Sequence, residues 1–203
     1  MMRIVVIGGT GTIGRSVVTD FASEHEVISV GRTPNPDSVT VNMSQPESIG
    51  KMFGQIGKVD AIITTAGGVT FKPIDELDSQ DVLNSLNDKL MGQINLVLIG
   101  KKYLNKGGSF TLTSGILSNR AIASGICAST VNGAINSFVQ ATACELIKHN
   151  IRINAVSPTV LKESYDNYFP YFSGFYPVSS KKVAYAYRMS VTGIETGRIF
   201  EVV

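Results

Sequence analysis

The sequence has few of the residues that build metal centres, disulfide frameworks and hydrolytic triads. Its 203 residues include no tryptophan, two cysteines and two histidines. Cys127 and Cys144 have no metal-ligand spacing and follow no recognisable signal peptide, so we expect free thiols in a reducing cytoplasm. His25 and His149 fall at the ends of expected helices, and no Ser-His-Asp arrangement accompanies them. We therefore expect neither a metal site nor a serine-hydrolase triad.

Long apolar runs and a strong net charge are missing as well. The first apolar run, in MMRIVVIGG, is too short for a signal peptide or a membrane span, and no later run reaches membrane length. The formal net charge is +2, which gives no general attraction to nucleic acid or to an anionic membrane. Because no repeat or linker interrupts the chain, we expect one cytoplasmic domain over residues 1–203.

Short apolar runs alternate with amphipathic segments of helical length. The runs RIVVIG and DAIITT are apolar on both faces, which is typical of parallel strands sandwiched between helices. The expected strands cover residues 3–8, 26–31, 39–42, 60–65, 109–114, 152–157 and 198–203, and the expected helices cover 12–23, 45–56, about 75–104 and 129–149. This alternation predicts an α/β fold with a Rossmann-like, doubly wound parallel sheet of about seven strands. Ligands of such sheets bind beyond the carboxyl ends of the strands.

A glycine-rich turn, GGTGTIG, joins the first expected strand to the first expected helix. Gly8 permits a tight turn, Gly11 lets backbone amides approach a pyrophosphate, and Gly14 lets the helix lie close to the sheet. The amides and dipole of the helix N-terminus favour an anion there. We therefore expect Thr10, Thr12 and Ile13, together with the three glycines, to bind a dinucleotide. The alternative is a tight turn without a ligand.

The second expected strand lacks the acidic residue that NAD-binding proteins place near its end. It reads ISVGRT and ends at Arg32 and Thr33. A guanidinium is well shaped for a 2′-phosphate, so we expect NADP(H), with NAD(H) as the weaker candidate. Arg15, just after the last glycine, could assist or simply point to water, and the alternative for Arg32 is an exposed loop arginine.

With these motifs, the chain resembles the short-chain dehydrogenase/reductase family over nearly its whole length. The segment Thr64–Gly67 is similar to the family's Asn-Asn-Ala-Gly element, which places Thr65, Ala66 and Gly67 beside the cofactor. Asn42 stands where the family often has an Asp near the adenine, and GGSFTLTSG matches the strand that ends in the catalytic serine, here Ser114. NIRINAVSP matches the strand that ends at Pro158, before a short substrate loop at about 159–177. The resemblance also implies a small-molecule substrate and a homodimer or homotetramer formed through the helices at about 78–104 and 129–148.

The family's catalytic residues are Asn, Ser, Tyr and Lys, and the Tyr-Lys pair is missing here. The tyrosine and lysine lie four residues apart on one helix face. An ungapped register puts these two places at Ala128 and Asn132, and a slip of two residues puts them at Ile126 and Thr130. Neither register restores the pair.

The preceding helix offers a compensation. The family's Asn-x-x-Gly motif aligns with Lys89–Gly92, so a lysine stands at the asparagine place and Asn132 stands at the lysine place. We expect Lys89 to supply the positive charge near Ser114, with a pKa lowered by burial. The alternatives are that Lys89 extends to solvent and that Asn87 is the asparagine equivalent.

The proton donor has three candidates: Lys89, Ser114 through a water, or a tyrosine of the substrate loop. That loop, SYDNYFPYFSGFYP, contains Tyr165, Tyr168, Tyr171 and Tyr176, and its aromatic content suits a flat or apolar substrate, a packed lid or a subunit interface. Cys127 adjoins the tyrosine place and is expected to be a buried small hydrophobe.

The leading hypothesis is an NADP(H)-dependent oxidoreductase acting on a small carbonyl or alcohol, with Ser114, Lys89 and Asn132 as catalytic residues. Losing a general acid costs about 10²- to 10⁴-fold in rate, and positioning of the reactants survives that loss. The alternatives are an inactive NADP-binding regulatory or scaffold protein, and different chemistry, such as isomerisation, on the bound cofactor.

Overall fold

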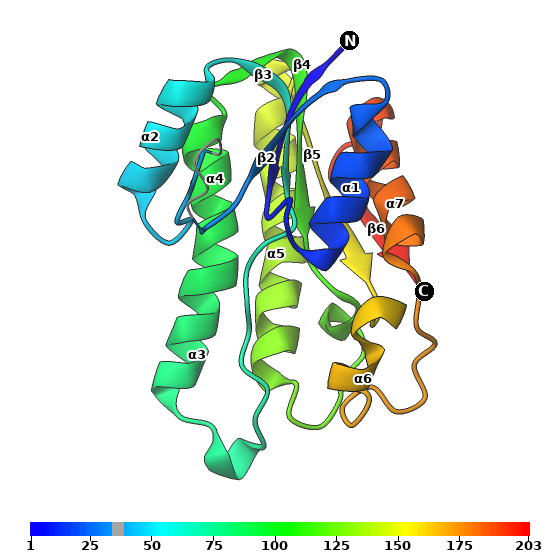
Figure 1. The fold of residues 1–203 in the computed structure, drawn as a ribbon. Coiled ribbons are helices and arrows are strands. Elements are labelled where there is room, and N and C mark those ends of the chain that lie inside the picture. The colour runs from blue at the N-terminus through cyan, green and yellow to red at the C-terminus, as the bar shows by residue number, and fades with distance from the viewer. Residues whose placement is uncertain (34–38) are drawn as a thin grey trace.

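Six parallel strands form the central sheet of the computed structural model, which describes residues 1–33 and 39–203 (Figure 1). The strands are β1 (Arg3–Ile7), β2 (Glu26–Val30), β3 (Val59–Thr64), β4 (Leu104–Thr113), β5 (Arg152–Pro158) and β6 (Ile199–Val202). Their order is β2-β1-β3-β4-β5-β6, and every neighbouring pair is parallel. The order reverses at β1, so the ligand-binding edge is at the carboxyl ends of β1 and β3.

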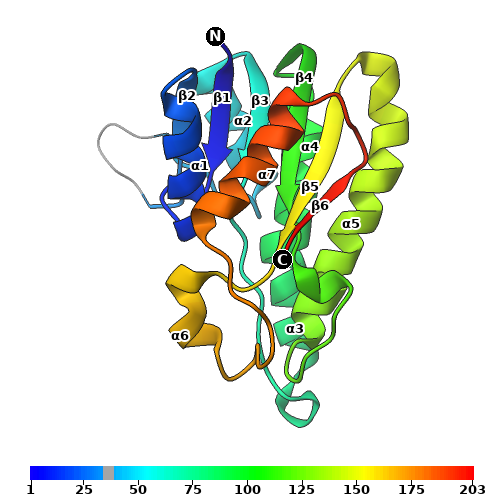
Figure 2. The same ribbon diagram turned by 90° about the vertical axis from the view of Figure 1, so that its right-hand side faces the viewer.

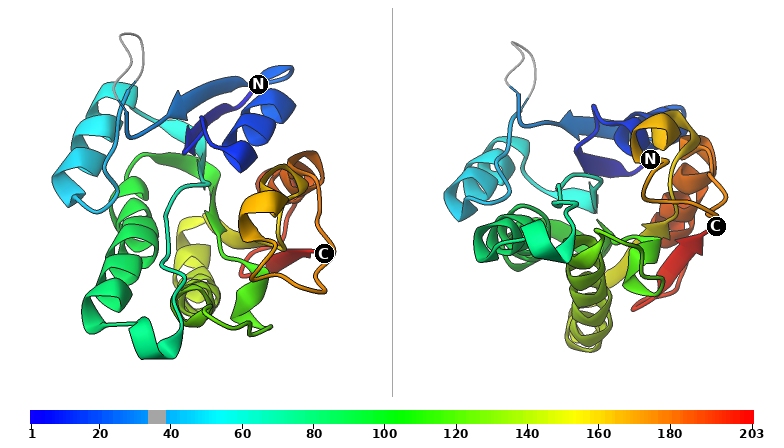
Figure 3. Two further views of the ribbon diagram at one scale, coloured as in Figure 1. Left: turned by 60° about the horizontal axis from the view of Figure 1, so that its bottom comes forward. Right: turned by 90° about the horizontal axis from the view of Figure 1, so that it is seen from below.

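Helices cover both faces of this sheet, as the end-on views show (Figure 3). They are α1 (Thr12–Ala22), α2 (Pro46–Ile56), α3 (Ser79–Ser85), α4 (Gly92–Gly100), α5 (Ile126–Leu146), α6 (Tyr165–Tyr168) and α7 (Ser180–Thr192). Helices α1 and α7 pack together on one face, around the fully buried Phe21 and Tyr187 (Figure 2). Helices α2, α4 and α5 cover the other face around a larger apolar core that includes Phe53, Leu96 and Phe110. Burial of both faces is why the strand sequences are apolar throughout.

The predicted fold class is confirmed, with one strand fewer than expected. Residues 39–42 form a single bridge, between Gly31 and Thr40, and no continuous strand. The chain turns away at Asn42, whose side-chain oxygen accepts a hydrogen bond from Ser44 N at 3.1 Å before α2 begins. Because that turn ends the pairing, β2 forms the edge of the sheet.

Helix α7 was not expected from the sequence. Its buried face consists largely of small and polar residues, namely Ser180, Val183, Ala184, Ala186, Tyr187, Ser190 and Val191. Serine and alanine are only weakly apolar, so the segment has low overall hydrophobicity and does not stand out as a helix with a buried face. Ser179 caps its start by accepting a hydrogen bond from Lys182 N at 3.2 Å.

The segment between α3 and α4 departs from regular α-helix. Leu86–Met91 (η2) is π-helical, and π-helical turns within α-helices are frequent at functional sites. Its Lys89 is buried. Helix α6 and the loop around it lie beyond the carboxyl ends of the strands (Figure 2). In the part of the chain that the structure describes, no helix has both the length and the apolar character needed to cross a membrane.

Candidate active site

The turn after β1 has the geometry of an anion cradle. Gly8 has φ +83°, which L side chains rarely adopt, and a Cβ on Gly14 would lie 2.0 Å from the Gly8 carbonyl oxygen. Helix α1 therefore starts directly against the turn. Gly11 is its N-cap without a side-chain hydrogen bond, and its first turn contains no acidic residue. The first-turn amides are thus left open to an anion. Arg15 stabilises the turn, since its Nε donates to the Thr10 carbonyl at 2.7 Å.

The segment after β3 packs onto this cradle. Thr65 Oγ1 donates toward the carbonyl oxygens of Ile7 and Gly8, at 3.2 and 3.1 Å. A Cβ on Gly8 would lie 2.9 Å from Ala66, so glycine is needed for that close approach. Gly67 has φ +118°, and a Cβ on it would lie 2.8 Å from Lys89 Cγ. The side chain of Lys89 therefore lies directly on the backbone of Gly67.

At the end of β2, Arg32 is paired with a carboxylate that the sequence did not single out. Arg32 Nη2 donates to Asp88 Oδ1 at 2.9 Å, and the Arg32 side chain is 68% exposed. Asp88 Oδ2 also accepts from Gly68 N at 2.8 Å. The next residue, Thr33, is exposed, and Asn42 uses its side chain to cap the turn toward α2.

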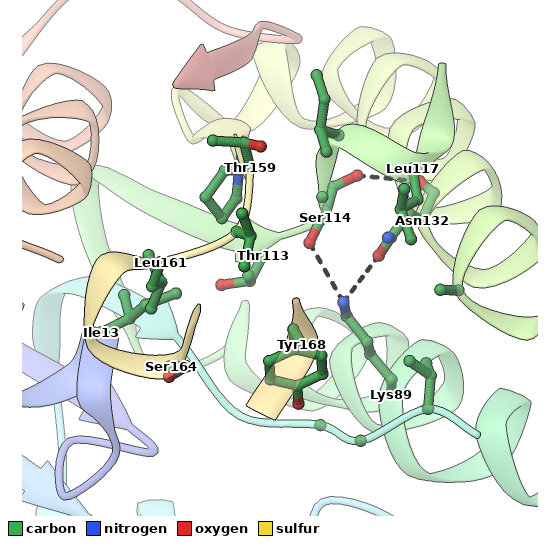
Figure 4. A pocket seen from close by; sticks show the side chains of 18 of the residues that line it. Ile13, Lys89, Thr113, Ser114, Leu117, Asn132, Thr159, Leu161, Ser164 and Tyr168 are labelled. Atoms are coloured by element: carbon green, nitrogen blue, oxygen red, sulfur yellow. Dashed lines mark hydrogen bonds between the residues drawn. The ribbon is translucent and has the colours of Figure 1, made fainter. Parts of the chain in front are cut away.

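Lys89, Asn132 and Ser114 meet at the carboxyl ends of the strands (Figure 4). Lys89 Nζ donates to Asn132 Oδ1 at 2.7 Å and to the Ser114 carbonyl oxygen at 3.2 Å. The hydroxyl of Ser114 turns the other way and donates to the Asn132 carbonyl oxygen at 3.1 Å. Three elements supply these groups: η2 supplies the lysine, α5 the asparagine, and the end of β4 the serine.

Burial changes the acidity of this cluster. Lys89 is 9% exposed, and its desolvation lowers the pKa of its ammonium group to about 8. Both of its protein acceptors are neutral oxygens, which solvate the ammonium without a compensating negative charge. An ammonium with a pKa near 8 is a strong enough acid to donate a proton near neutral pH.

The cluster opens into a cavity of about 390 Å³. Of the residues expected at the site, those lining the cavity are Thr12, Ile13, Thr65, Ala66, Gly67, Lys89, Ser114, Asn132 and Pro158. The other expected residues, which are absent from this lining, are Gly8, Thr10, Gly11, Gly14, Arg32, Thr33 and Asn42. Gly8, Gly11 and Gly14 shape the cradle beside the cavity, whereas Arg32 and Asn42 lie at the end of β2 and before α2.

Several cavity residues were not named individually from the sequence, although those after β5 fall within the substrate loop expected at about 159–177. Val69 and Phe71 follow β3, Ile116 and Leu117 follow β4, and Thr159, Val160, Leu161, Ser164 and Phe172 follow β5. Their positions just after strands were the available signal, because loops after parallel strands meet at one edge of the sheet. Among the loop tyrosines, Tyr168 lines the cavity (Figure 4). Cys127 is buried beside Ala128.

A doubly wound parallel sheet, a glycine cradle at its first strand and a cavity at the carboxyl ends define a Rossmann-type α/β protein. A family profile described as enoyl-(acyl carrier protein) reductase matches residues 14–194. The chain belongs to the short-chain dehydrogenase/reductase family, a family of oxidoreductases.

Known proteins similar to the chain carry reductase or dehydrogenase names. L-xylulose reductase of Mus musculus is 28% identical over 174 residues, which cover 78% of this chain and 71% of the relative. A bifunctional ribulose 5-phosphate reductase/CDP-ribitol pyrophosphorylase of Haemophilus influenzae is 28% identical over 98% of this chain and 43% of its own length.

Two solved structures share the fold closely. The protein lin1944 of Listeria innocua is 44% identical, with a TM-score of 0.96 and full coverage of both chains. A small-chain dehydrogenase in complex with NADPH is 27% identical, with a TM-score of 0.87, over 98% of this chain and 95% of the other.

Proposed function

We propose that the protein is an NADP(H)-dependent oxidoreductase for a small carbonyl or alcohol, in which Lys89 replaces the family's Tyr-Lys pair. The observation that carries the proposal is the buried Lys89 Nζ, held between Asn132 and Ser114 at 2.7 and 3.2 Å. Ala128 and Asn132 line the cavity, whereas Ile126 and Thr130 are exposed. This difference supports the register in which Ala128 and Asn132 occupy the tyrosine and lysine places.

The residues around the cavity fit the cofactor. The open amides at the start of α1 suit a pyrophosphate, and Thr65, Ala66 and Gly67 form the adjoining wall. Arg32 is the cation for the 2′-phosphate, which it reaches by leaving Asp88. Ile13 and Pro158 also line the cavity, where they would pack against the cofactor. An NADPH-bound relative of the same fold supports this choice of cofactor.

The roles of the catalytic residues follow from their hydrogen bonds. When bound, the cofactor supplies or accepts the hydride. An ammonium has three N–H donors, and Asn132 and Ser114 accept two of those of Lys89. The third donor binds the substrate oxygen and delivers the proton during reduction. The Ser114 hydroxyl is a second donor to that oxygen once it leaves the Asn132 carbonyl.

The test is transfer of deuterium from NADPH labelled at the nicotinamide C4 to a panel of aldehydes, ketones and quinones. Lys89→Met keeps the length of the side chain and removes its charge, so we expect transfer to fall by about 10²- to 10⁴-fold. Lys51→Ala, on the exposed side of α2, is the matched control and should change nothing.

Transfer that survives in Lys89→Met would refute the role of the lysine. NADPH binding without transfer to any substrate of the panel would favour a regulatory or scaffold protein instead.

A further inference from the structure

The cavity has one polar end and one apolar wall. The polar end holds Lys89, Ser114 and Asn132. Beside it lies an apolar cluster that includes Ala128, at the tyrosine place of the family. Its buried members are Ile116, Leu117, Ala128, Val160 and Phe172, each at most 7% exposed. The small side chain of Ala128 leaves room where a tyrosine would stand, so the apolar wall reaches the catalytic lysine.

Aromatic rings extend this wall into the substrate loop. The ring of Phe71 lies 5.8 Å from that of Tyr168 in an edge contact, and Tyr168 makes a second edge contact with Phe172 at 6.2 Å. Phe172 continues the chain of rings to Phe175 at 5.3 Å. Edge contacts of this kind stabilise aromatic clusters beyond their buried area.

The base of the substrate loop is fastened to the domain. Lys162 N donates to the Val178 carbonyl at 2.8 Å, and Val178 N donates to the Val160 carbonyl at 3.0 Å. Glu163 accepts from both N and Oγ of Ser180, at 2.8 and 2.6 Å, at the start of α7. These contacts fix both ends of the loop, and its Tyr168 and Phe172 line the same cavity as Lys89.

The charged residues that line the cavity indicate which class of substrate it can bind. Lys89 is the single cationic residue among the described residues that line the cavity, and that lining contains no aspartate or glutamate. One remaining N–H of Lys89 serves one carbonyl oxygen. Substrate hydroxyls that pack against the buried members of the apolar cluster would be unpaired, which costs about 1–3 kcal/mol for each buried group, whereas the hydroxyls of Thr159, Ser164 and Tyr168 line the rest of the cavity. A phosphate ester would bring two negative charges to that one cation.

We infer that the substrate is an uncharged carbonyl compound with an apolar ring body, and that sugars and sugar phosphates are poor substrates. The inference rests on the proposed function and adds the substrate class to it. At about 390 Å³, including the part facing the cofactor, the cavity lies near the lower limit for ligand sites and suits one ring. In this the chain would differ from its relatives named for L-xylulose and ribulose 5-phosphate.

The first arm of the test compares substrates on the NADPH-loaded protein. We expect kcat/KM for benzaldehyde to exceed that for L-xylulose and for ribulose 5-phosphate by at least about 100-fold. A preference for either sugar would overturn the inference and leave the proposed oxidoreductase intact.

The second arm measures binding without turnover. Benzamide has an uncharged aromatic body and a carbonyl that is not reduced, and saturation-transfer NMR would report its contact with the NADPH-loaded protein. Binding is expected in the wild type and in Phe172→Leu, and it should weaken by about 10-fold or more in Phe172→Asn. Phe169→Asn is the matched control, since Phe169 lies in the same loop, is 56% exposed and is absent from the cavity lining.

The two arms of the test distinguish the proposed oxidoreductase function from the inferred substrate class. Benzamide binding that depends on Phe172, without hydride transfer to any compound, supports the apolar site and refutes the proposed function. No benzamide binding, or equal loss in Phe172→Asn and Phe169→Asn, overturns the inference of an apolar substrate.

Discussion

The expected cofactor end of the cavity is made of backbone, and the catalytic end is made of side chains. At the first end, Gly8, Gly11 and Gly14 bring main-chain amides to the start of α1, whose first turn has no acidic residue. At the second end, one ammonium group is held by Asn132 and Ser114, which come from two other elements. Backbone cradles depend on a local pattern and tolerate few changes of side chain. A side-chain cluster can exchange its members, provided that charge and hydrogen bonds are kept.

The largest expected effect comes from exchanging two of those members. Lys89→Asn removes the acid and should lower hydride transfer by about 10²- to 10⁴-fold. Asn132→Lys alone adds a second buried cation beside the first. The double variant Lys89→Asn/Asn132→Lys keeps one cation and one amide, so it should recover at least about 10-fold over Lys89→Asn. Single-turnover rates of the three variants measure this. A double variant no better than Lys89→Asn would show that the position of the cation matters and not only its presence.

The next effect tests the backbone end. A Cβ in Gly14→Ala would collide with the Gly8 carbonyl at 2.0 Å, so we expect a loss of about 3 kcal/mol in the free energy of unfolding and weaker NADPH binding. Gly50→Ala is the matched control, because Gly50 also lies in a helix and its Cβ would meet nothing within 4 Å. That variant should be stabilised by about 0.5–1 kcal/mol. Urea unfolding measures the stability of both variants, and NADPH titration measures their cofactor binding. If Gly14→Ala and Gly50→Ala changed both quantities equally, the close packing of the glycine turn would be contradicted.

Cofactor selectivity provides a smaller effect. Arg32→Ala removes the expected partner of the 2′-phosphate, so NADPH binding should weaken by about 10- to 100-fold while NADH binding changes little. Isothermal titration with both cofactors measures the ratio. If NADH binding falls as much as NADPH binding, Arg32 contacts the part that the two cofactors share and does not recognise the 2′-phosphate.

The smallest effect concerns Asp88, which holds Arg32 at 2.9 Å. Asp88→Asn keeps an oxygen for Gly68 N and removes the charge that competes with a phosphate. Because exposed ion pairs contribute about 0.2–1 kcal/mol, NADPH should bind about 2- to 5-fold more tightly, with NADH unchanged. Weaker NADPH binding in this variant would mean that Asp88 positions the guanidinium for the cofactor.

The same contrast explains what the sequence could predict. The glycine turn and the sheet follow from local patterns, and the chain from Gly8 to Gly14 folds as expected. The place of Lys89 near Ser114 was expected through the family alignment, since their 25-residue separation leaves no local signal, whereas the hydrogen bond from Lys89 to Asn132 was not foreseen. The Arg32–Asp88 pair and the place of Phe172 in the cavity depend on tertiary packing, and helix α7 was missed because serine and alanine form much of its buried face.

The central claim is that Lys89 is the acid of the reaction, and the pH dependence of hydride transfer tests it most directly. Burial lowers the pKa of Lys89 to about 8, so the donating ammonium form predominates below that pH and is lost above it. Single-turnover reduction by the wild type should therefore fall by about tenfold for each pH unit above about 8, and Lys89→Met should lack this decline. A wild-type decline that persists unchanged in Lys89→Met would assign the proton to another group and contradict the account.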